Sequence, residues 1–407
     1  MNKMAMRLFL LVMASAFVVV GFANPIIPIP TQPQPLVFAA AAPDLNATAY
    51  ILVDATSGKI LAEKNADTRI PPASLTKLMS LYVISSAIKN GQIHWNDKVR
   101  ISQKAWQTGG SRMFLKVGDE VAVRDLLQGI IVESGNDATV ALAEYVAGSE
   151  DSFVSLMNQQ AQLLGMKNSH FVDCDGLPDP NHYSTAHDLS ILTRAYIQNF
   201  PEDYSFYSEK WFEYGGIRQP NRNRLLWDYQ YADGLKTGHT DEAGYCLVGS
   251  AKKDGMRLIS VVLGEPNDQG RTEDSIRLLD YGFRFFETHQ IYKAQDVVTT
   301  ARILGGSNPE VRLGTGQDFY VTMPAGQFKR VQTNIVLNNP LNAPIVKGKA
   351  YGTVQVVLDN KVLAATPLIA MDSSAPGNLF RRATDKIKLD LSKYFSKADT
   401  NDKINTG

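Results

Sequence analysis

The sequence contains few cysteines and histidines, and it lacks the common cofactor motifs. Only two cysteines, Cys174 and Cys246, occur among 407 residues, which excludes a disulfide framework and a four-thiolate zinc site. The six histidines form no H-E-x-x-H motif, and neither a Walker A motif nor a G-x-G-x-x-G motif is present. We therefore expect no metal ion and no other cofactor.

The sequence also lacks a net charge. Its 41 Lys and Arg residues balance 41 Asp and Glu residues, so there is no electrostatic reason to expect nucleic acid as a partner. Apolar residues make up 44% and charged residues 20% of the chain, as in globular proteins. The length predicts two or three domains.

The N-terminus has the pattern of a secretory signal. Two basic residues within the first seven positions precede an uncharged run from Leu8 to Ala23, which is shorter than the roughly 20 residues of a transmembrane helix. We predict a signal peptide at 1–23, a Pro- and Ala-rich leader at 24–43, and export of the protein. Cleavage at 39–42 and a retained signal anchor are the alternatives.

Residues 44–288 combine helical and strand patterns. A β-hairpin is predicted at 48–66, and strand-like runs at 244–252 and 256–263 flank a tight-turn signal. The spacing of apolar residues predicts helices at 75–90, 121–132, 137–147, 152–164, 186–198 and 272–287. We therefore expect an α/β domain in which helices flank an antiparallel sheet.

Residues 291–371 consist almost entirely of strand and turn patterns. Strands are predicted at 297–303, 318–323, 330–337 and 351–358. No pair of ionisable residues stands there at a spacing typical of catalysis. This segment is expected to be an all-β spacer or interaction domain rather than a second active site.

Three short motifs contain residues suited to catalysis, and the first is Ser74-Leu75-Thr76-Lys77. The spacing of three places Ser74 and Lys77 one turn apart on the same face of a helix. A buried lysine can accept the proton of a serine nucleophile, because desolvation favours the neutral amine. Considered alone, the motif is common and is better explained by an N-cap serine and a surface lysine.

The second and third motifs lie further along the chain. Ser134-Gly135-Asn136 falls between two predicted helices, where the serine could relay a proton and the asparagine could bind a substrate carbonyl. Lys236-Thr237-Gly238 precedes the predicted strand pair. There the lysine and threonine could bind a terminal carboxylate, and glycine permits close approach of an extended peptide. Considered alone, each motif is also an ordinary turn sequence.

Together and in this order, the motifs resemble those of low-molecular-mass penicillin-binding proteins, the serine D-alanyl-D-alanine carboxypeptidases of peptidase S11 type. The resemblance covers residues 44 to about 395. It implies a β-lactamase/DD-peptidase catalytic domain at 44–288 and an all-β domain at 291–371. Flanking sequences that agree with the family lie at 72–79, 133–138, 221–227, 233–240 and 281–286.

The resemblance also implies a role for each motif residue. Ser74 would be the acylated nucleophile, Lys77 its general base and Ser134 a catalytic proton relay. The N–H groups of Ser74 and His239 would form the oxyanion hole. The substrate-binding residues would be Asn136, Lys236, Thr237, Gly238, His239, Arg222 and Arg271. Structural ion pairs are the alternative for the two arginines.

Two further expectations concern individual residues. Lys77 should have a lowered pKa, through burial and the nearby Lys236, whereas Lys236 should stay charged to face a substrate carboxylate. Family members carry a cysteine soon after the S-G-N motif, but this chain has Thr139, so sensitivity to thiol reagents is not expected.

The segment 377–397 predicts an amphipathic helix. Phe380, Ile387, Leu391 and Phe395 are among the apolar residues that fall on one helix face. Six basic and two acidic side chains give the segment a net charge of +4, which suits an anionic membrane surface. We predict peripheral association with the periplasmic side of the cytoplasmic membrane. Packing of this helix on the β-rich domain is the alternative.

The sequence therefore predicts an exported carboxypeptidase that removes the terminal D-alanine from peptidoglycan stem pentapeptides through an acyl-enzyme on Ser74, with β-lactams as inhibitors. A DD-endopeptidase acting on cross-linked peptidoglycan would use the same residues. A catalytically silent peptidoglycan-binding protein is the alternative of a different class, but it would not need the nucleophile.

Overall fold

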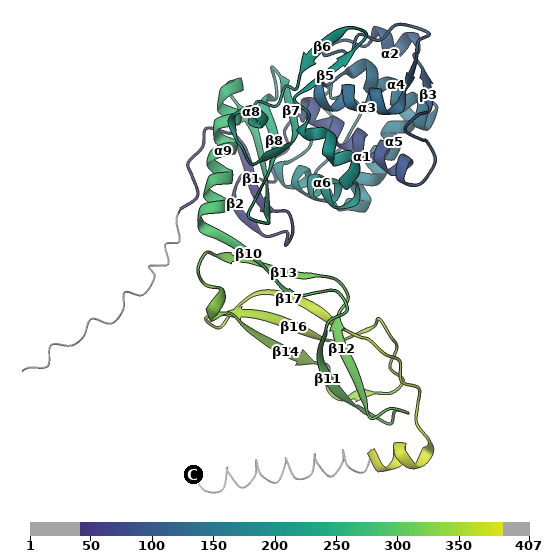
Figure 1. The fold of residues 1–407 in the computed structure, drawn as a ribbon, viewed down its shortest axis with the longest axis vertical. Helices are drawn as coiled ribbons and strands as arrows, with labels where there is room; N and C mark the ends of the chain where they lie inside the picture. The colour runs from purple at the N-terminus through teal and green to yellow at the C-terminus, as the bar shows by residue number, and fades with distance from the viewer. Residues whose placement is uncertain (1–40, 386–407) are drawn as a thin grey trace, which may run out of the picture. The chain divides into compact units, whose positions relative to one another are not determined.

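The computed structural model describes residues 41–385 (Figure 1). The predicted signal peptide 1–23, nearly all of the leader 24–43 and the part of helix 377–397 beyond residue 385 lie outside the described residues.

A five-stranded antiparallel sheet forms the centre of the first domain, in the order β2-β1-β9-β8-β7. The predicted hairpin is confirmed as β1 (Ala49–Asp54) and β2 (Ile60–Lys64). The predicted late strand pair is β8 (Gly244–Lys253) and β9 (Met256–Glu265). Strand β7 (Ala232–Thr240) stands at the end of this order, so one of its edges has no neighbouring strand in the sheet.

Helices lie beside this sheet, most of them close to their predicted positions (Figure 1). The predicted segment 75–90 begins as a 3-10 turn, Ala73–Thr76, and continues as α1 (Lys77–Lys89). The last helix, predicted at 272–287, is α9 (Asp268–Phe285), which starts earlier because Asn267 caps it by accepting a hydrogen bond from the N–H of Gly270. The other helices are α2 (Gln103–Gln107), α3 (Val123–Val132), α4 (Asn136–Ala147), α5 (Glu150–Leu164), α6 (Ala186–Asn199), α7 (Pro201–Tyr204) and α8 (Leu225–Asp228).

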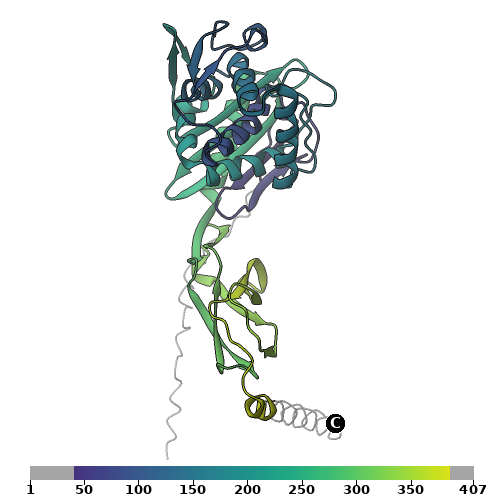
Figure 2. The same ribbon diagram turned by 90° about the vertical axis from the view of Figure 1, so that its right-hand side faces the viewer.

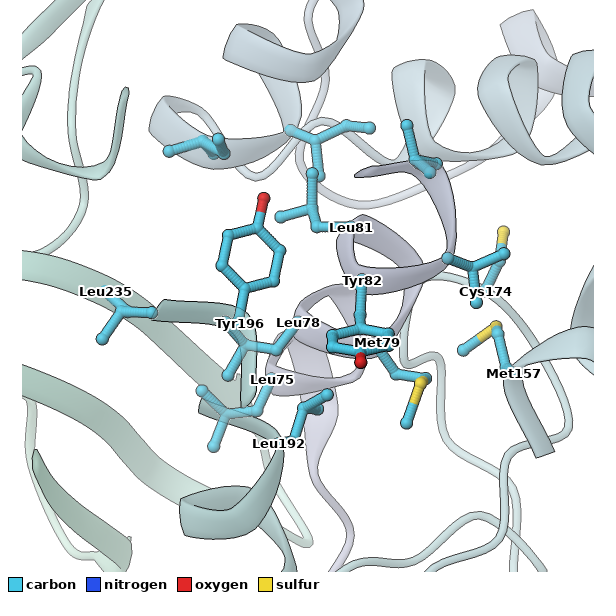
Figure 3. Packing of buried hydrophobic residues seen from close by; sticks show 14 of the residues in the cluster. Leu75, Leu78, Met79, Leu81, Tyr82, Met157, Cys174, Leu192, Tyr196 and Leu235 are labelled. Carbon is cyan, nitrogen blue, oxygen red and sulfur yellow. The ribbon is translucent and has the colours of Figure 1, made fainter. Parts of the chain in front are cut away.

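Helix α1 runs through the interior of the first domain, and ten of its thirteen residues are buried. Figure 3 shows Leu78 and Met79 of this helix packed among Met157, Leu192 and Tyr196, which come from α5 and α6. A helix that is surrounded by apolar side chains on all faces is fixed in position by packing. The residues at its N-terminal end therefore stand on a rigid support.

Two small two-stranded sheets accompany the helices. Strand β3 (Lys98–Arg100) pairs with β4 (Glu120–Ala122), and β5 (Trp211–Tyr214) pairs with β6 (Ile217–Pro220). A 3-10 turn at Ser205–Ser208 precedes β5.

The segment after α9 forms an all-β domain with its own core (Figure 2). Strands β10 (Phe286–Tyr292) and β13 (Phe319–Pro324) pair with each other. A second sheet has the order β14-β16-β17-β12-β11-β15. Its strands are β11 (Val297–Leu304), β12 (Glu310–Thr315), β14 (Gln332–Leu337), β15 (Leu341–Asn342), β16 (Ala350–Leu358) and β17 (Lys361–Ala370), and a 3-10 turn spans Phe328–Arg330.

The four predicted strands of this domain are confirmed as β11, β13, β14 and β16. The sequence patterns did not identify β10, β12, β15 and β17 as separate strands. Pro367 interrupts the strand pattern of β17. It pairs with Thr353 on β16 but lies just outside the residues of β17 that pair with β12, which begin at Leu368. A proline is therefore accommodated in this inner strand.

Within residues 41–385, no helix is long and apolar enough to cross a membrane. Residues 379–385 are helical, which is the described part of the predicted C-terminal helix. Leu379 and Phe380 are 81% and 79% exposed, while Asp385 accepts hydrogen bonds from Gly305 and Arg302 of the β-rich domain. This first part of the helix thus contacts the domain through polar groups and leaves its apolar side chains exposed.

Candidate active site

The first motif forms a compact turn directly before α1. Pro72 accepts a hydrogen bond from the N–H of Leu75, and Lys77 is completely buried at the start of the helix. The ammonium nitrogen Nζ of Lys77 lies 3.0 Å from Ser74 Oγ and 2.6 Å from the carbonyl oxygen of Asp175, and it donates to both. The predicted proximity of Ser74 and Lys77 is therefore observed.

Burial lowers the pKa of Lys77, which is also lowered by the charge of Arg222. The acidic groups of the 173–175 segment, mainly Asp175, oppose this shift without cancelling it. A lowered pKa favours the neutral amine, which can accept a proton from a hydroxyl at hydrogen-bond distance. The position and the electrostatics of Lys77 both suit a general base.

The second motif lies between α3 and α4, as predicted. Ser134 has a positive φ of 64° and is buried, and its hydroxyl has no hydrogen-bond partner among the described residues. The side-chain NH₂ group of Asn136 donates to the carbonyl of Gly109 at 2.7 Å. The amide oxygen Oδ1 of Asn136 has no hydrogen-bond partner within residues 41–385. The Ser134 hydroxyl and the Asn136 amide oxygen are thus buried polar groups without a hydrogen-bond partner among the described residues.

A neighbouring carboxylate holds a loop beside this motif. Asp137 accepts hydrogen bonds from the N–H groups of Met113 at 2.8 Å and Leu115 at 3.1 Å. Together with the bond from Asn136 to Gly109, these contacts fix the 109–115 loop against the start of α4. The sequence analysis did not identify this role of Asp137.

The third motif lies on the edge strand β7. Lys236 and Thr237 are buried, whereas His239 is exposed and its ring lies 4.0 Å from that of Tyr245. Gly238 packs against the first motif, because a Cβ at this position would come within 2.8 Å of the Pro72 carbonyl oxygen. The absence of a side chain thus lets the edge strand approach the turn that carries Ser74.

Burial also lowers the pKa of Lys236, and the charges of Lys77, Arg222 and Arg271 act in the same direction. That Lys236 is charged when it faces a substrate carboxylate stays a prediction. Positive charges that lie near one another disfavour the protonation of Lys236, which is itself buried. A substrate carboxylate would reverse this effect by stabilising a charged Lys236.

The two arginines occupy different environments. Arg222 is exposed, and its Nε donates to the carbonyl of Glu133, the residue before Ser134. Arg271 is buried and donates to the carbonyls of Gly238 and Cys246, and it also pairs with Asp268. These contacts make Arg271 a support for β7 and β8.

Segment 173–176 was not recognised from the sequence as part of the site. Asp175 holds Lys77 through its carbonyl group, and its carboxyl group is buried without a hydrogen-bond partner in the described residues. Burial raises the pKa of this carboxyl to about 6, although the charge of Lys77 opposes the shift. Almost a hundred residues separate the two, so no local spacing could have revealed the contact.

Cys174 and Cys246 are both buried and unpaired. Within residues 41–385, no group of three or more His, Cys, Asp or Glu side chains could hold a metal ion.

Two protein families match consecutive parts of this chain. Residues 36–267 match Peptidase S11, described as D-alanyl-D-alanine carboxypeptidase, and residues 286–374 match the C-terminal domain of penicillin-binding protein 5. The stretch between the two matches, 268–285, is the whole of helix α9, and the second match begins where the all-β domain begins.

Curated relatives match over most of their length. The chain is 46% identical to the D-alanyl-D-alanine carboxypeptidase DacC of Escherichia coli strain K12, over 89% of this chain and 93% of that protein. It is 45% identical to DacA of the same strain, over 87% of this chain and 90% of that protein.

A solved structure shares both domains. Penicillin-binding protein 5 from Haemophilus influenzae superposes with a TM-score of 0.81 and 44% sequence identity, covering 83% of this chain and 99% of that one. Penicillin-binding protein D2 from Listeria monocytogenes, solved in an ampicillin-bound form, has a TM-score of 0.56 and 33% identity over 60% of this chain and all of that one. These matches agree with the order of the three motifs in the sequence. They show that this chain belongs to the peptidase S11 family of D-alanyl-D-alanine carboxypeptidases.

Proposed function

We propose that the protein removes the terminal D-alanine from peptidoglycan stem pentapeptides through an acyl-enzyme on Ser74. The observation that carries this proposal is the 3.0 Å contact between Lys77 Nζ and Ser74 Oγ, made by a buried lysine with a lowered pKa. A hydroxyl becomes an effective nucleophile only when a base can take its proton.

In the proposed reaction, Lys77 accepts the proton of Ser74 as Oγ attacks the carbonyl between the two terminal D-alanines. The backbone N–H groups of Ser74 and His239 stabilise the oxyanion. Ser134 passes a proton to the departing amine of D-alanine. Water then hydrolyses the ester, which releases the shortened peptide and restores Ser74.

The edge of β7 is the proposed docking site for the substrate. An extended peptide can add to an unpaired strand edge through main-chain hydrogen bonds. Lys236 and Thr237 would bind the terminal carboxylate, with Arg222 nearby, while Asn136 would bind a peptide amide. Gly238 keeps this strand close to Ser74, and Arg271 supports it from the side of β8.

A β-lactam amide resembles the scissile bond, so penicillin should acylate Ser74 and leave a slowly hydrolysed ester. Intact-mass measurement followed by peptide mapping should place the adduct on Ser74. Ser74→Ala should form no adduct and release no D-alanine. Ser86→Ala is the matched control, because Ser86 lies on the same helix and its hydroxyl donates to the Tyr82 carbonyl. An adduct on another residue would overturn the assignment.

Release of D-alanine from a pentapeptide tests the carboxypeptidase activity directly. Faster cleavage of a cross-linked peptide dimer would instead identify a DD-endopeptidase, which would use the same residues. Folded protein that binds peptidoglycan but cleaves neither substrate would establish the binding protein as the correct alternative.

We further propose the cellular location from the chain's terminal segments. Residues 1–23 would be removed as a signal peptide, 24–43 would serve as a leader, and 377–397 would bind the periplasmic surface of the cytoplasmic membrane. The exposed Leu379 and Phe380 support this role for the C-terminal segment. In this arrangement residues 44–288 are the catalytic domain and residues 291–371 the spacer.

A further inference from the structure

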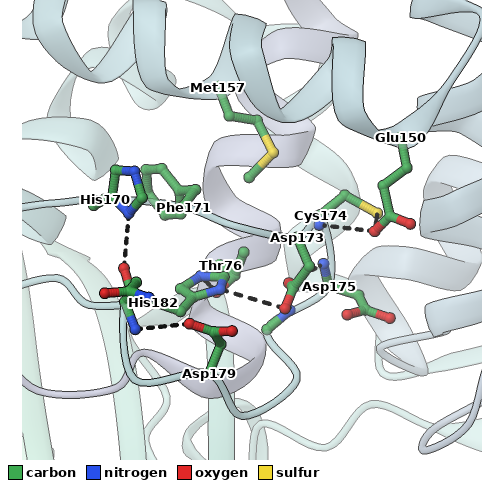
Figure 4. A network of polar contacts seen from close by, with 12 residues as sticks. Thr76, Glu150, Met157, His170, Phe171, Asp173, Cys174, Asp175, Asp179 and His182 are labelled. Carbon is green, nitrogen blue, oxygen red and sulfur yellow. Dashed lines mark hydrogen bonds and ion pairs between the residues drawn. The ribbon is translucent and has the colours of Figure 1, made fainter.

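A chain of buried polar contacts lies behind the turn that carries Ser74, and the proposed reaction does not use it (Figure 4). Thr76 is completely buried, and its hydroxyl lies 2.9 Å from Nε2 of His182, which is only 2% exposed. On the other side of the ring, Nδ1 of His182 lies 3.4 Å from a carboxylate oxygen of Asp173. The second contact has an ion-pair distance without the alignment of a hydrogen bond.

The same carboxylate fixes the backbone that holds Lys77. Oδ1 of Asp173 accepts hydrogen bonds from the N–H groups of Asp175 at 3.0 Å and Gly176 at 2.6 Å. The carbonyl of Asp175 then accepts the bond from Lys77 Nζ at 2.6 Å. The contacts therefore form a closed network, called here the Thr76–His182–Asp173 circuit. It runs from Thr76 through His182 and segment 173–176 to Lys77, which follows Thr76 in the sequence.

His182 is itself held in a fixed orientation. Its ring meets the ring of Phe171 edge to face, with centroids 5.6 Å apart and an interplanar angle of 89°. Its backbone N–H donates to the carbonyl of Asp179 at 3.0 Å. Burial alone would raise the pKa of Asp173, but His182 and the two backbone donors outweigh it and lower that pKa. The carboxylate is thus kept charged next to the imidazole.

We propose that His182 is a positioning residue. By contacting both Thr76 and Asp173, it holds segment 173–176 in place, so that the Asp175 carbonyl keeps Lys77 Nζ at Ser74. The proposal rests on the proposed function, because it assumes that Lys77 is the base for Ser74. A small displacement of a catalytic group lowers a rate by up to about a hundredfold. Loss of this circuit should therefore slow acylation without weakening the binding of the β-lactam.

The test compares His182→Gln with His170→Gln in the full exported protein. His170 is the matched control because its Nδ1 bonds to the Asn181 carbonyl in the same loop, while its contacts do not include Thr76. Stopped-flow acylation with a fluorescent penicillin separates the binding constant from the maximal acylation rate. Active-site titration gives that rate per folded molecule, and thermal unfolding reports stability separately.

We expect His182→Gln to lower the maximal acylation rate about tenfold to a hundredfold with an unchanged binding constant, and His170→Gln to stay within about twofold of the parent protein. An unchanged acylation rate in folded His182→Gln would overturn the proposal. Equal losses in the two variants would also overturn it, because they would indicate a general effect of the loop.

A second pair of variants decides the matter if His182→Gln does not fold. Thr76→Val removes the hydroxyl at nearly constant volume, whereas Thr76→Ser keeps it. We expect Thr76→Val to reproduce the loss of acylation rate and Thr76→Ser to retain most of the parent rate. Equal rates in these two variants would contradict the role of the hydroxyl. If the parent protein itself forms no adduct at Ser74, the proposed function fails instead.

Discussion

Gly176 lies so close to Ala73 that a Cβ added to it would come within 1.9 Å of the Ala73 carbonyl oxygen. Gly176 also has a φ of +87°, a conformation that residues with a side chain rarely adopt. The segment that holds Lys77 and the turn that carries Ser74 are thus in backbone contact, and only glycine allows it.

Gly176→Ala should therefore destabilise the protein and abolish acylation, because the new methyl group must push the two segments apart. Gly148→Ala is the control, since Gly148 has a similar φ of +78° but nothing within 4 Å of an added Cβ. The shared backbone strain should cost about 1–2 kcal/mol in both variants, and the steric clash about 1–3 kcal/mol more in Gly176→Ala. Urea unfolding measures both values, and equal losses would contradict the assigned contact.

The two lysines should respond differently to replacement by arginine. Lys77→Arg should abolish acylation, because a guanidinium stays protonated and cannot accept the proton of Ser74. Lys236→Arg keeps a positive charge beside the substrate carboxylate, so it should retain some acylation and bind the peptide more weakly. The measurements are the rates of penicillin acylation and D-alanine release, with folding checked by circular dichroism. Parent-like acylation by folded Lys77→Arg would refute the general-base role.

Glu133 should make stability depend on pH. Its carboxyl group is buried without a hydrogen-bond partner among the described residues, and burial together with Asp137 raises its pKa from 4.5 to about 8, despite the opposing charge of Arg222. The folded state then binds this proton more tightly than the unfolded chain. The contribution of the Glu133 proton to the free energy of unfolding is fully present below pH 4.5, and it is lost as the pH rises through about 8.

Glu133→Gln should consequently gain stability relative to the parent protein between pH 5 and pH 9, because the amide does not ionise. Melting temperatures across this range test the prediction. Glu63→Gln, at an exposed position on β2, serves as the control and should show no such trend. A constant difference between Glu133→Gln and the parent protein at all pH values would contradict the raised pKa.

Truncation tests the proposed membrane association. Deleting 377–407 should release the protein from membranes and preserve carboxypeptidase activity, since all three motifs lie before residue 240. Deleting only 386–407 keeps the contacts of Asp385 with Arg302 and Gly305, and it should give the same release. Membrane fractionation and activity assays provide the measurements. Persistent membrane binding would point to the N-terminal segment as the anchor, and loss of activity would favour packing of the helix on the fold.

Local patterns were sufficient to predict most elements and the three motifs. The hairpin at 48–66 is encoded by two apolar runs on either side of one turn, and the spacing of Ser74 and Lys77 fixes their proximity within a single helical turn. The order of the motifs also led to the correct family. These features depend on residues that are near one another in the sequence.

The supports of the site depend on distant residues and could not be read from such patterns. Asp175 contacts Lys77 from a segment with no regular secondary structure, and Asp137 binds a loop more than twenty residues before it. The lowered pKa of Lys236 results from burial and from cations that the fold brings together. Each of these features depends on tertiary packing, which composition and periodicity do not encode.

The position of β1 has a consequence for how the chain reaches its native state. This strand, near residue 50, is held between β2 and β9, and Ala49 lies opposite Leu263. A ribosome delivers the N-terminal strand first, so it must wait until more than two hundred further residues have been synthesised before its main partner exists. Contacts this distant in sequence form slowly. A chain that stays unfolded during this delay is suited to passage through a narrow channel, so under the proposed export the central sheet would close only after β9 has crossed the membrane.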